Sequence, residues 1–143
     1  MVPAYKEKRD PHLFLHRFLE YLNSSPMLDF VRQVTGHADV GKADAQATRY
    51  LPGHYLRRHN DIIRADPEDN RRAAYVFNLT RDWQADWGGQ LQFLHDDGGV
   101  EQSWVPGFNT MSLFSVPVWH CVSCVAPFAT APRLAITGWF RPR

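Results

Sequence analysis

The chain has 143 residues, of which 44% are hydrophobic and 13% are aromatic. It can therefore bury one core but is too short for two ordinary domains, and its formal net charge of +1 argues against a broad nucleic-acid-binding surface. No stretch is apolar over the length of a signal peptide or a membrane span, so we expect a cytoplasmic protein without membrane or nucleic-acid partners. The sequence leaves the oligomeric state open.

Two amphipathic helices are predicted before residue 42. The first, in DPHLFLHRFLEYLNS, has Asp10 as its N-cap and Pro11 in its first turn, and the second begins at Ser25 and Pro26 and ends at Gly36. Their apolar faces consist of Leu15, Phe18, Leu19 and Leu22 in the first helix and of Leu28, Val31 and Val34 in the second.

After Gly41 the sequence consists of short runs of β-branched and aromatic residues separated by Pro, Gly, Asp and Asn, which is typical of an all-β unit. The predicted strands are 43–51, 54–60, 73–79, 90–94, 101–105, 110–116, 120–125 and 133–140. Such strands after two helices predict a mainly β fold, a double-stranded β-helix (jelly roll) with the helices packed on one sheet. We expect one domain, with residues 1–42 as a helical support and residues 43–143 as the core.

Three His-x-Asp motifs are candidates for metal binding, namely His37-Ala38-Asp39, His59-Asn60-Asp61 and His95-Asp96-Asp97. A jelly roll brings its second and seventh strands side by side, and in this chain those strands carry His59 at one end and His120 at the other. Asp61 follows His59 by two residues, and in an extended chain two such side chains point to the same side. His37 follows a helix-ending glycine and His95 begins the hairpin-like HDDGG, so both are interpreted as loop residues.

Two imidazoles and one carboxylate form the ligand set that is diagnostic of non-haem Fe(II) oxygenases. The set leaves adjacent coordination positions open, which a chelating co-substrate and O₂ require. His59, Asp61 and His120 are therefore our candidate metal ligands.

The last predicted strand, in PRLAITGWFRP, adds a candidate for anion binding. Alternation places Arg133, Ala135, Thr137 and Trp139 on one face and Leu134, Ile136, Gly138 and Phe140 on the other. The second face is expected to pack against the helices. Arg133 begins the first face, near the barrel mouth, where its planar guanidinium could hold a carboxylate.

Four segments of the chain follow one another in the order RYLPGHYLRRHND, YVFNLTRDWQADWGGQLQF, SVPVWHCVSCV and RLAITGWF. Together they resemble the 2-oxoglutarate and Fe(II)-dependent dioxygenases, and among these the prolyl 4-hydroxylase-like group. The resemblance implies that His59, Asp61 and His120 bind iron and that Arg133 pairs with the distal carboxylate of 2-oxoglutarate. It also implies that the co-substrate pocket includes Tyr50, Thr137 and Asn78, the last of which stands where the family often has a tyrosine. Gly88, Gly89, Leu91 and Phe93 look like an architectural signature of the family.

The activity that the resemblance implies is hydroxylation of an unactivated C–H bond, with succinate and CO₂ as co-products. Its cofactor is Fe(II), its co-substrates are 2-oxoglutarate and O₂, and ascorbate is a candidate reductant. The expected partner is a small-molecule or peptide substrate, either a prolyl residue or a small amino-acid-like compound.

Substrate choice is expected to depend on the loops 61–72 and 95–101. Trp83, Trp87 and Trp119 are candidates for cavity walls or a lid. A local positive rim, which would suit an anionic small molecule, could be formed by Arg57, Arg58, Arg64, Arg71 and Arg72.

Two other classes of protein are compatible with the sequence. One is a cupin-like module that binds a metal or ligand without redox chemistry, and it would have no need of a carboxylate clamp such as Arg133 with Tyr50. The other is an interaction domain that uses the motif formed by Cys121 and Cys124. No second cysteine pair completes a zinc site, so we interpret this motif as a buried thiol pair.

Overall fold

Helices come first in the chain and β-strands follow in the structure, a computed structural model that describes residues 10–62 and 70–143. In chain order the elements are α2 (Phe14–Leu22), α3 (Ser25–Thr35), β1 (Lys42–Ala43), β2 (Gln46–Tyr50), β3 (Leu56–His59), β4 (Ala73–Asn78), the 3-10 turn η1 (Ala85–Trp87), β5 (Leu91–Leu94), β6 (Val100–Trp104), β7 (Thr110–Ser115), β8 (His120–Val122) and β9 (Arg133–Arg141).

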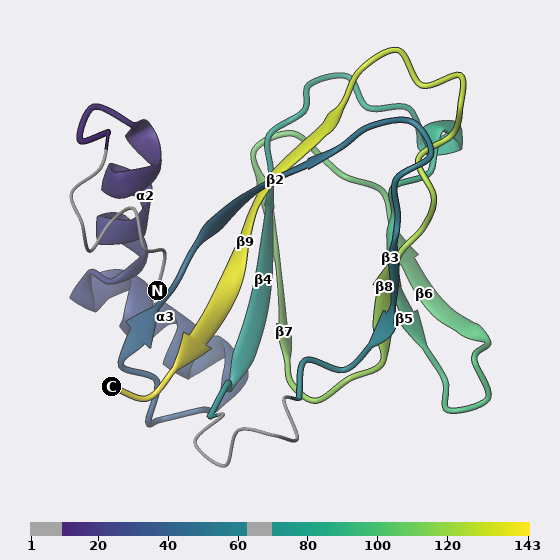
Figure 1. Ribbon diagram of the computed structural model, residues 1–143. Coiled ribbons are helices and arrows are strands. Elements are labelled where there is room, and N and C mark those ends of the chain that lie inside the picture. The colour runs from purple at the N-terminus through teal and green to yellow at the C-terminus, as the bar shows by residue number, and fades with distance from the viewer. Residues whose placement is uncertain (1–9, 63–69) are drawn as a thin grey trace.

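Two antiparallel sheets face each other and form the framework of the fold (Figure 1). In the first sheet β9 lies between β4 and the short strands β1 and β2, and β4 pairs with β7 along its other edge. The second sheet has the order β3-β8-β5-β6. Helices α2 and α3 lie on the outer side of the first sheet, so the predicted double-stranded β-helix and the placement of its helices are confirmed.

The strand expected at 43–51 is divided into β1 and β2 in the structure. Asp44 lies at the break, where its carboxylate accepts a hydrogen bond from the Trp139 backbone N–H and its carbonyl accepts one from the Tyr75 hydroxyl. The same carbonyl passes so close to Gly138 that a Cβ there would lie 2.2 Å from the oxygen. The break therefore depends on partners far along the chain, and each of the other expected runs overlaps one observed strand.

The first helix begins at Phe14, three residues later than predicted. Asp10 is not its N-cap, because residues 10–13 form a turn in which the Asp10 carbonyl accepts from the Leu13 N–H, with Pro11 at a position that turns favour. The second helix runs from Ser25 to its left-handed C-cap Gly36, as predicted. Neither described helix has the length and apolarity that crossing a bilayer requires.

The main core lies between the helices and the outer face of the first sheet. It contains Leu19, Leu22, Leu28 and Val31 from the helices and Tyr75, Ile136 and Phe140 from β4 and β9. Burying an aromatic side chain such as Phe140 contributes about 2–3 kcal/mol. Val34, predicted for the packed face, is instead 60% exposed in the last turn of α3.

The inner faces of the two sheets leave room between them. Val76 and Ala135 from the first sheet meet Leu91 and Phe93 from the second in a smaller apolar cluster. Because side chains alternate along a strand, the inward positions of β9 are those of Arg133, Ala135, Thr137 and Trp139, as predicted. The fold thus directs one side of β9 at the helices and the other at an internal cavity.

Candidate active site

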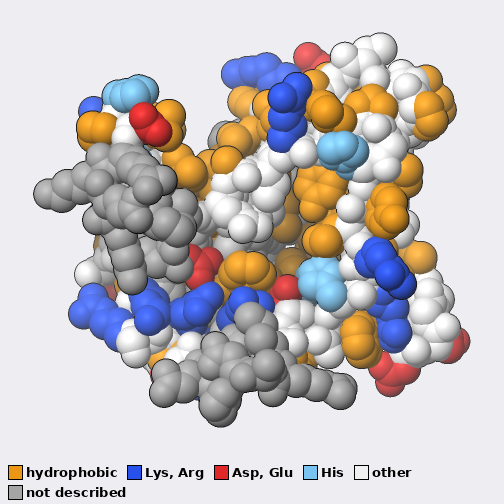
Figure 2. All heavy atoms as spheres, in the orientation of Figure 1, with side chains coloured by type: hydrophobic (Ala, Val, Ile, Leu, Met, Phe, Trp, Pro, Cys, Tyr) orange, Lys and Arg blue, Asp and Glu red, His pale blue; other side chains and the backbone are white. Residues whose placement is uncertain are grey.

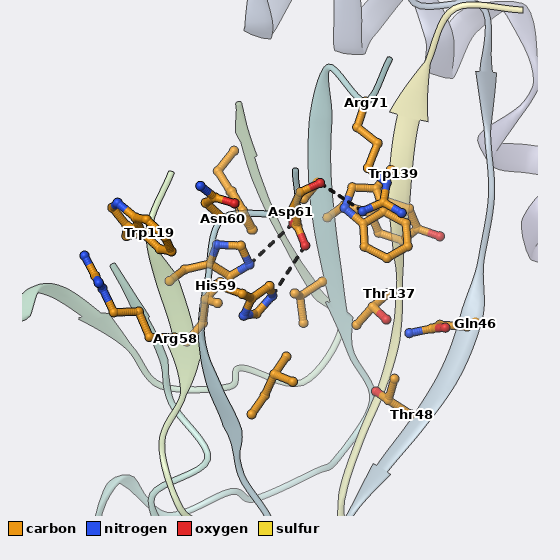
Figure 3. Close-up of a pocket in the computed structure, with 18 of the residues that line it drawn as sticks. Gln46, Thr48, Arg58, His59, Asn60, Asp61, Arg71, Trp119, Thr137 and Trp139 are labelled. Carbon is orange, nitrogen blue, oxygen red and sulfur yellow. Dashed lines mark hydrogen bonds and ion pairs between the residues drawn. The ribbon is translucent and has the colours of Figure 1, made fainter. Parts of the chain in front are cut away.

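His59, Asp61 and His120 meet at one end of the space between the sheets (Figure 3). Strands β3 and β8 pair with His59 directly opposite His120, and the imidazole centroids are 4.1 Å apart. The Asp61 carboxylate lies 3.4 Å from Nε2 of His59 and 3.5 Å from Nε2 of His120. The predicted juxtaposition of the second and seventh expected strands is therefore what brings the two histidines together.

Asp61 reaches the cluster in a way that the sequence did not predict. We expected His59 and Asp61 to share one side of an extended strand, but β3 ends at His59 and Asp61 has a φ of +64°. The chain therefore turns through the left-handed region, which aspartate tolerates better than most residues. The carboxylate faces the imidazoles because of this turn and not because of strand alternation.

The two imidazoles present the same nitrogen to the centre of the cluster. Nδ1 of His59 lies 2.7 Å from the carbonyl oxygen of Arg57, and Nδ1 of His120 lies 2.8 Å from that of Val118. A carbonyl oxygen can only accept, so each Nδ1 carries the proton. In the neutral ring Nε2 then has a free lone pair, and the backbone contact fixes the ring as in many metal-binding histidines.

Burial and neighbouring charge shift the pKa of each group in the cluster. Burial lowers the pKa of His120, which favours the neutral imidazole that binds metals. The hydrogen bond with the Asp61 carboxylate raises the pKa of His59. Burial tends to raise the pKa of Asp61, but the neighbouring His59, Trp139 and His120 outweigh it, so the pKa lies below its ordinary value and the group is an anion at neutral pH.

The cluster has the donor set and the spacing of a metal site. The three ligand atoms lie within 4.8 Å of one another, and among residues 10–62 and 70–143 no other three His, Cys, Asp or Glu side chains converge in this way. Ligands about 2.1 Å from an ion are separated by roughly 3.0–3.4 Å at angles near 90–109°, close to the two distances from Asp61. Two imidazoles and one carboxylate suit Fe(II).

The other His-x-Asp motifs lie elsewhere, as predicted. His95 begins a turn in which its N–H donates to the Gly99 carbonyl. Asp39 is held at the surface by the guanidinium of Arg72.

A cavity of about 600 Å³ lies beside the three side chains. Figure 2 shows the molecule hollowed between the two sheets. The walls come from both sheets and include Tyr50, Leu56, Val76, Leu91, Phe114, Trp119, Thr137 and Trp139. The lining is thus largely apolar, with polar side chains near the metal-ligand candidates and at Gln46, Thr48 and Thr137, an arrangement that holds a small group while limiting its contact with water.

Arg133 is a buried cation at the start of β9. It is 2% exposed, its Nε has no hydrogen-bond partner, and among the described residues it forms no ion pair. Its guanidinium carbon lies 5.3 Å from the ring centroid of Tyr50, which lines the cavity. Burial lowers the pKa of Arg133, yet an arginine remains charged at neutral pH, so the described part of the chain buries a positive charge without a paired anion.

Of the other predicted co-substrate residues, Tyr50 and Thr137 line the cavity, whereas Asn78, like Arg133, is not among its lining residues. Burial raises the pKa of Tyr50, so the phenol keeps its proton and can donate a hydrogen bond. Asn78 is buried opposite Ala135 in the pairing of β4 with β9, and its Oδ1 has no partner. Oδ1 of Asn78 and Nε of Arg133 are therefore both buried without a hydrogen-bond partner among the described residues.

Some residues predicted for the cavity lie elsewhere. Of the expected arginine rim, Arg58 and Arg71 line the cavity, whereas Arg72 pairs with Asp39. Trp119 lines it too, but Trp83 and Trp87 pack edge to face against each other in a separate apolar cluster. They are therefore neither its walls nor its lid. Arg64 and most of the loop 61–72 lie outside the described residues.

The cysteines are not a buried pair. Both are free, Cys124 is exposed and Cys121 is half-buried, because Cys121 points away from the cavity between the inward residues His120 and Val122. Burial raises the pKa of the Cys121 thiol, which makes it less reactive.

The sequence analysis missed two features of the site. Arg71 donates a hydrogen bond to the Asp61 carbonyl and stacks on Trp139. Gly89 has a φ of +61°, and a Cβ there would lie 2.9 Å from Cδ of Arg133. The doublet formed by Gly88 and Gly89 was the available signal, since paired glycines often mark left-handed backbone or a close approach.

Comparison with known proteins relates this geometry to a family. Residues 45–141 match the sequence model of the 2OG-Fe(II) oxygenase superfamily. The prolyl 3-hydroxylase OGFOD1 of Mus musculus is 28% identical over 142 residues, which are 94% of this chain and 24% of that protein.

Solved structures agree with the fold. The crystal structure of a Pseudomonas putida prolyl-4-hydroxylase superposes with a TM-score of 0.70 and 26% identity, covering 90% of this chain and 65% of that one. A prolyl hydroxylase from Trichoplax adhaerens, in complex with a hypoxia inducible factor oxygen degradation domain peptide fragment, gives a TM-score of 0.62 and 25% identity over 85% of this chain and 55% of that one. This chain thus spans about a quarter of the mouse protein and less than two thirds of either of these two structures.

Proposed function

This chain belongs to the 2OG-Fe(II) oxygenase superfamily, and from that premise we propose that it is an Fe(II)- and 2-oxoglutarate-dependent hydroxylase of a prolyl residue or a small amino-acid-like substrate. The observation that carries the proposal is the convergence of His59, Asp61 and His120 within 4.8 Å beside a cavity. Fe(II) with 2-oxoglutarate and O₂ supplies the oxidising power for hydroxylation of an unactivated C–H bond, with release of succinate and CO₂.

The protein's first task is to hold the metal with part of its coordination shell open. Nε2 of His59, Nε2 of His120 and one carboxylate oxygen of Asp61 would be the ligands. The backbone carbonyls of Arg57 and Val118 fix the orientation of both imidazole rings, so these rings lose little conformational freedom when the metal binds. Three protein ligands leave the remaining positions for the co-substrate and O₂.

The second task is to orient the co-substrate. The Arg133 guanidinium would donate hydrogen bonds to its distal carboxylate, and the Tyr50 hydroxyl would donate to the same group. Thr137 and Asn78 would complete the polar end of the pocket. A buried cation that forms no ion pair among the described residues supports this assignment, since burying a charge is costly unless a ligand compensates it.

The third task is to present the substrate in a site that limits its contact with water. Phe114, Leu91 and Val76 form apolar walls near the cluster. Such walls suit a pyrrolidine ring or a similar aliphatic group. The prolyl hydroxylase relatives favour a prolyl residue of a peptide over a free amino acid, and the cavity's contact with solvent between the sheets is compatible with a peptide.

The remaining predictions from the sequence form part of the proposal. Residues 1–42 would serve as a helical support for the core at 43–143, since α2 and α3 bury their apolar faces on β4 and β9. The two free cysteines suit the reducing cytoplasm predicted from the sequence. Ascorbate would serve as a reductant.

The test is anaerobic addition of Fe(II) and then 2-oxoglutarate, followed by visible absorption. The expected result is a weak metal-to-ligand charge-transfer band that is absent in His59→Ala and weakened in Arg133→Ala. Turnover is then tested with O₂ and proline-containing peptides, with succinate and an added oxygen atom in the peptide as readouts. Folded protein that binds Fe(II) but gives no band with 2-oxoglutarate would favour a non-catalytic binding module.

A further inference from the structure

Asp61 is the candidate metal ligand that no strand holds in place. The histidines are fixed in register on the paired strands β3 and β8, whereas Asp61 follows the end of β3 with a φ of +64°. Residues that carry a Cβ rarely adopt this conformation, and alternatives are open to the chain at such a point. A contact from outside β3 is therefore needed to keep the carboxylate directed at the two imidazoles.

Arg71 makes such a contact from the segment before β4. Its Nη1 donates a partly buried hydrogen bond of 2.9 Å to the Asp61 backbone carbonyl. Its guanidinium carbon lies 3.9 Å from the ring centroid of Trp139. Trp139 is fixed in turn, because it pairs with Ala74 across β9 and β4. Figure 3 shows Arg71 and Trp139 together beside Asp61, on the side away from the imidazoles.

We propose that Arg71, stacked on Trp139, is a positioning residue that holds the Asp61 peptide in its left-handed conformation and so directs its carboxylate at His59 and His120. Arg71 bonds the backbone carbonyl of Asp61, which leaves the carboxylate oxygens that face the imidazoles for a metal. The inference rests on the proposed function, because the metal is the group toward which the carboxylate is positioned.

A loosened Asp61 should weaken metal binding without unfolding the protein. Without the hydrogen bond from Arg71 the peptide can leave the left-handed region, and metal binding must then order it again. Removing a residue that holds a metal ligand in place typically lowers the affinity for the metal by about 10- to 100-fold, and we expect a loss in this range for Arg71→Ala. The helices and the main core do not depend on this contact.

The neighbouring Arg72 offers a matched control. Its guanidinium is bound by the Asp39 carboxylate at the surface, and among the described residues its side chain makes no hydrogen bond or ion pair with the cluster. Arg72→Ala therefore removes the same charge from the same segment while leaving the Asp61 carbonyl bonded. A surface ion pair of this kind contributes little to stability.

The experiment titrates Co(II) into wild type, Arg71→Ala, Arg71→Lys and Arg72→Ala, with the d–d absorption bands as the readout and the thermal midpoint of each metal-free protein recorded beside it. We expect equal Kd values for wild type and Arg72→Ala, and a Kd raised about 10- to 100-fold with altered bands for Arg71→Ala. Arg71→Lys should lie between them, because lysine keeps the charge but loses the planar fork that stacks on Trp139.

The outcomes separate the two proposals. If wild type does not bind Co(II), the metal site of the proposed function fails and the role of Arg71 fails with it. If wild type binds while Arg71→Ala binds equally well with the same bands, the positioning role is overturned and the proposed function stands. Should Arg71→Ala fail to fold, Arg71→Lys decides, since an unchanged Kd and spectrum in that variant would equally overturn the role.

Discussion

Replacing Arg133 by methionine should stabilise the protein in the absence of co-substrate and abolish its response to 2-oxoglutarate. Methionine fills much of the same space but carries no charge. Arg133 is 2% exposed, and its guanidinium carbon lies 5.3 Å from the centroid of the Tyr50 ring, a cation–π contact worth at most about 2 kcal/mol. Burying an ion costs several kcal/mol, and replacing buried charges by apolar residues has stabilised proteins by about 1–4 kcal/mol.

The assay is reversible unfolding by urea or heat, with and without 2-oxoglutarate and metal. In a chain of this size a gain of 1 kcal/mol raises the midpoint by roughly 2–4 °C, so we expect a rise of at least that much for Arg133→Met without ligand. At 100 times its Kd the co-substrate should stabilise wild type by about 2.7 kcal/mol and leave the variant unchanged. Arg49→Met, which removes an exposed arginine from β2, should stay within about 0.5 kcal/mol of wild type.

One result would refute the reasoning. Arg133→Met without ligand could be less stable than wild type by 2 kcal/mol or more, on the order of a lost buried interaction. In that case contacts within the folded protein already offset the cost of burying the guanidinium. Arg133 would then be a structural residue, and its unpartnered Nε would no longer support a carboxylate site.

Three further predictions address the metal, the co-substrate pocket and the cysteines. His59→Ala should weaken Co(II) binding at least about 100-fold, since it removes one of three ligands, while circular dichroism stays unchanged; unaltered affinity would remove the ligand assignment. Gly89→Ala should raise the 2-oxoglutarate concentration for half-saturation about tenfold or more without changing metal affinity, because its Cβ would lie 2.9 Å from Cδ of Arg133, and an unchanged titration would contradict that contact. The double variant Cys121→Ser and Cys124→Ser should bind metal as wild type does and unfold within about 1 kcal/mol of it, so loss of metal binding would point to a thiol site instead.

Much of the fold was predictable because it depends on local patterns. Proline at the start and glycine at the end placed the second helix correctly, and alternation along β9 correctly separated Ile136 and Phe140, which face the helices, from Thr137, which faces the cavity. These patterns follow from the periods of 3.6 and 2 that the backbone imposes. The pairing of β3 with β8 followed from strand order once the jelly roll was recognised.

The predictions that failed concern positions where the sequence pattern allows more than one arrangement and the folded structure decides between them. Asp10 forms a turn with Leu13 and does not cap the helix, and Val34 is exposed. Trp83 and Trp87 pack against each other and do not line the cavity. The exposure of Cys124, which follows β8, likewise depends on how the chain packs after that strand ends.

The sequence by itself determined the mainly β framework, its two supporting helices and the residue types that gather at the cavity. Periodicity and turn preferences depend on residues that are close together in the chain, so they can be read from the sequence. Only the tertiary structure decided that Asp61 approaches His59 and His120 through a left-handed turn held by Arg71, and that Gly89 leaves space for a buried Arg133. Such contacts join residues far apart in the chain, and a left-handed backbone at a non-glycine residue persists only where those contacts offset its conformational cost.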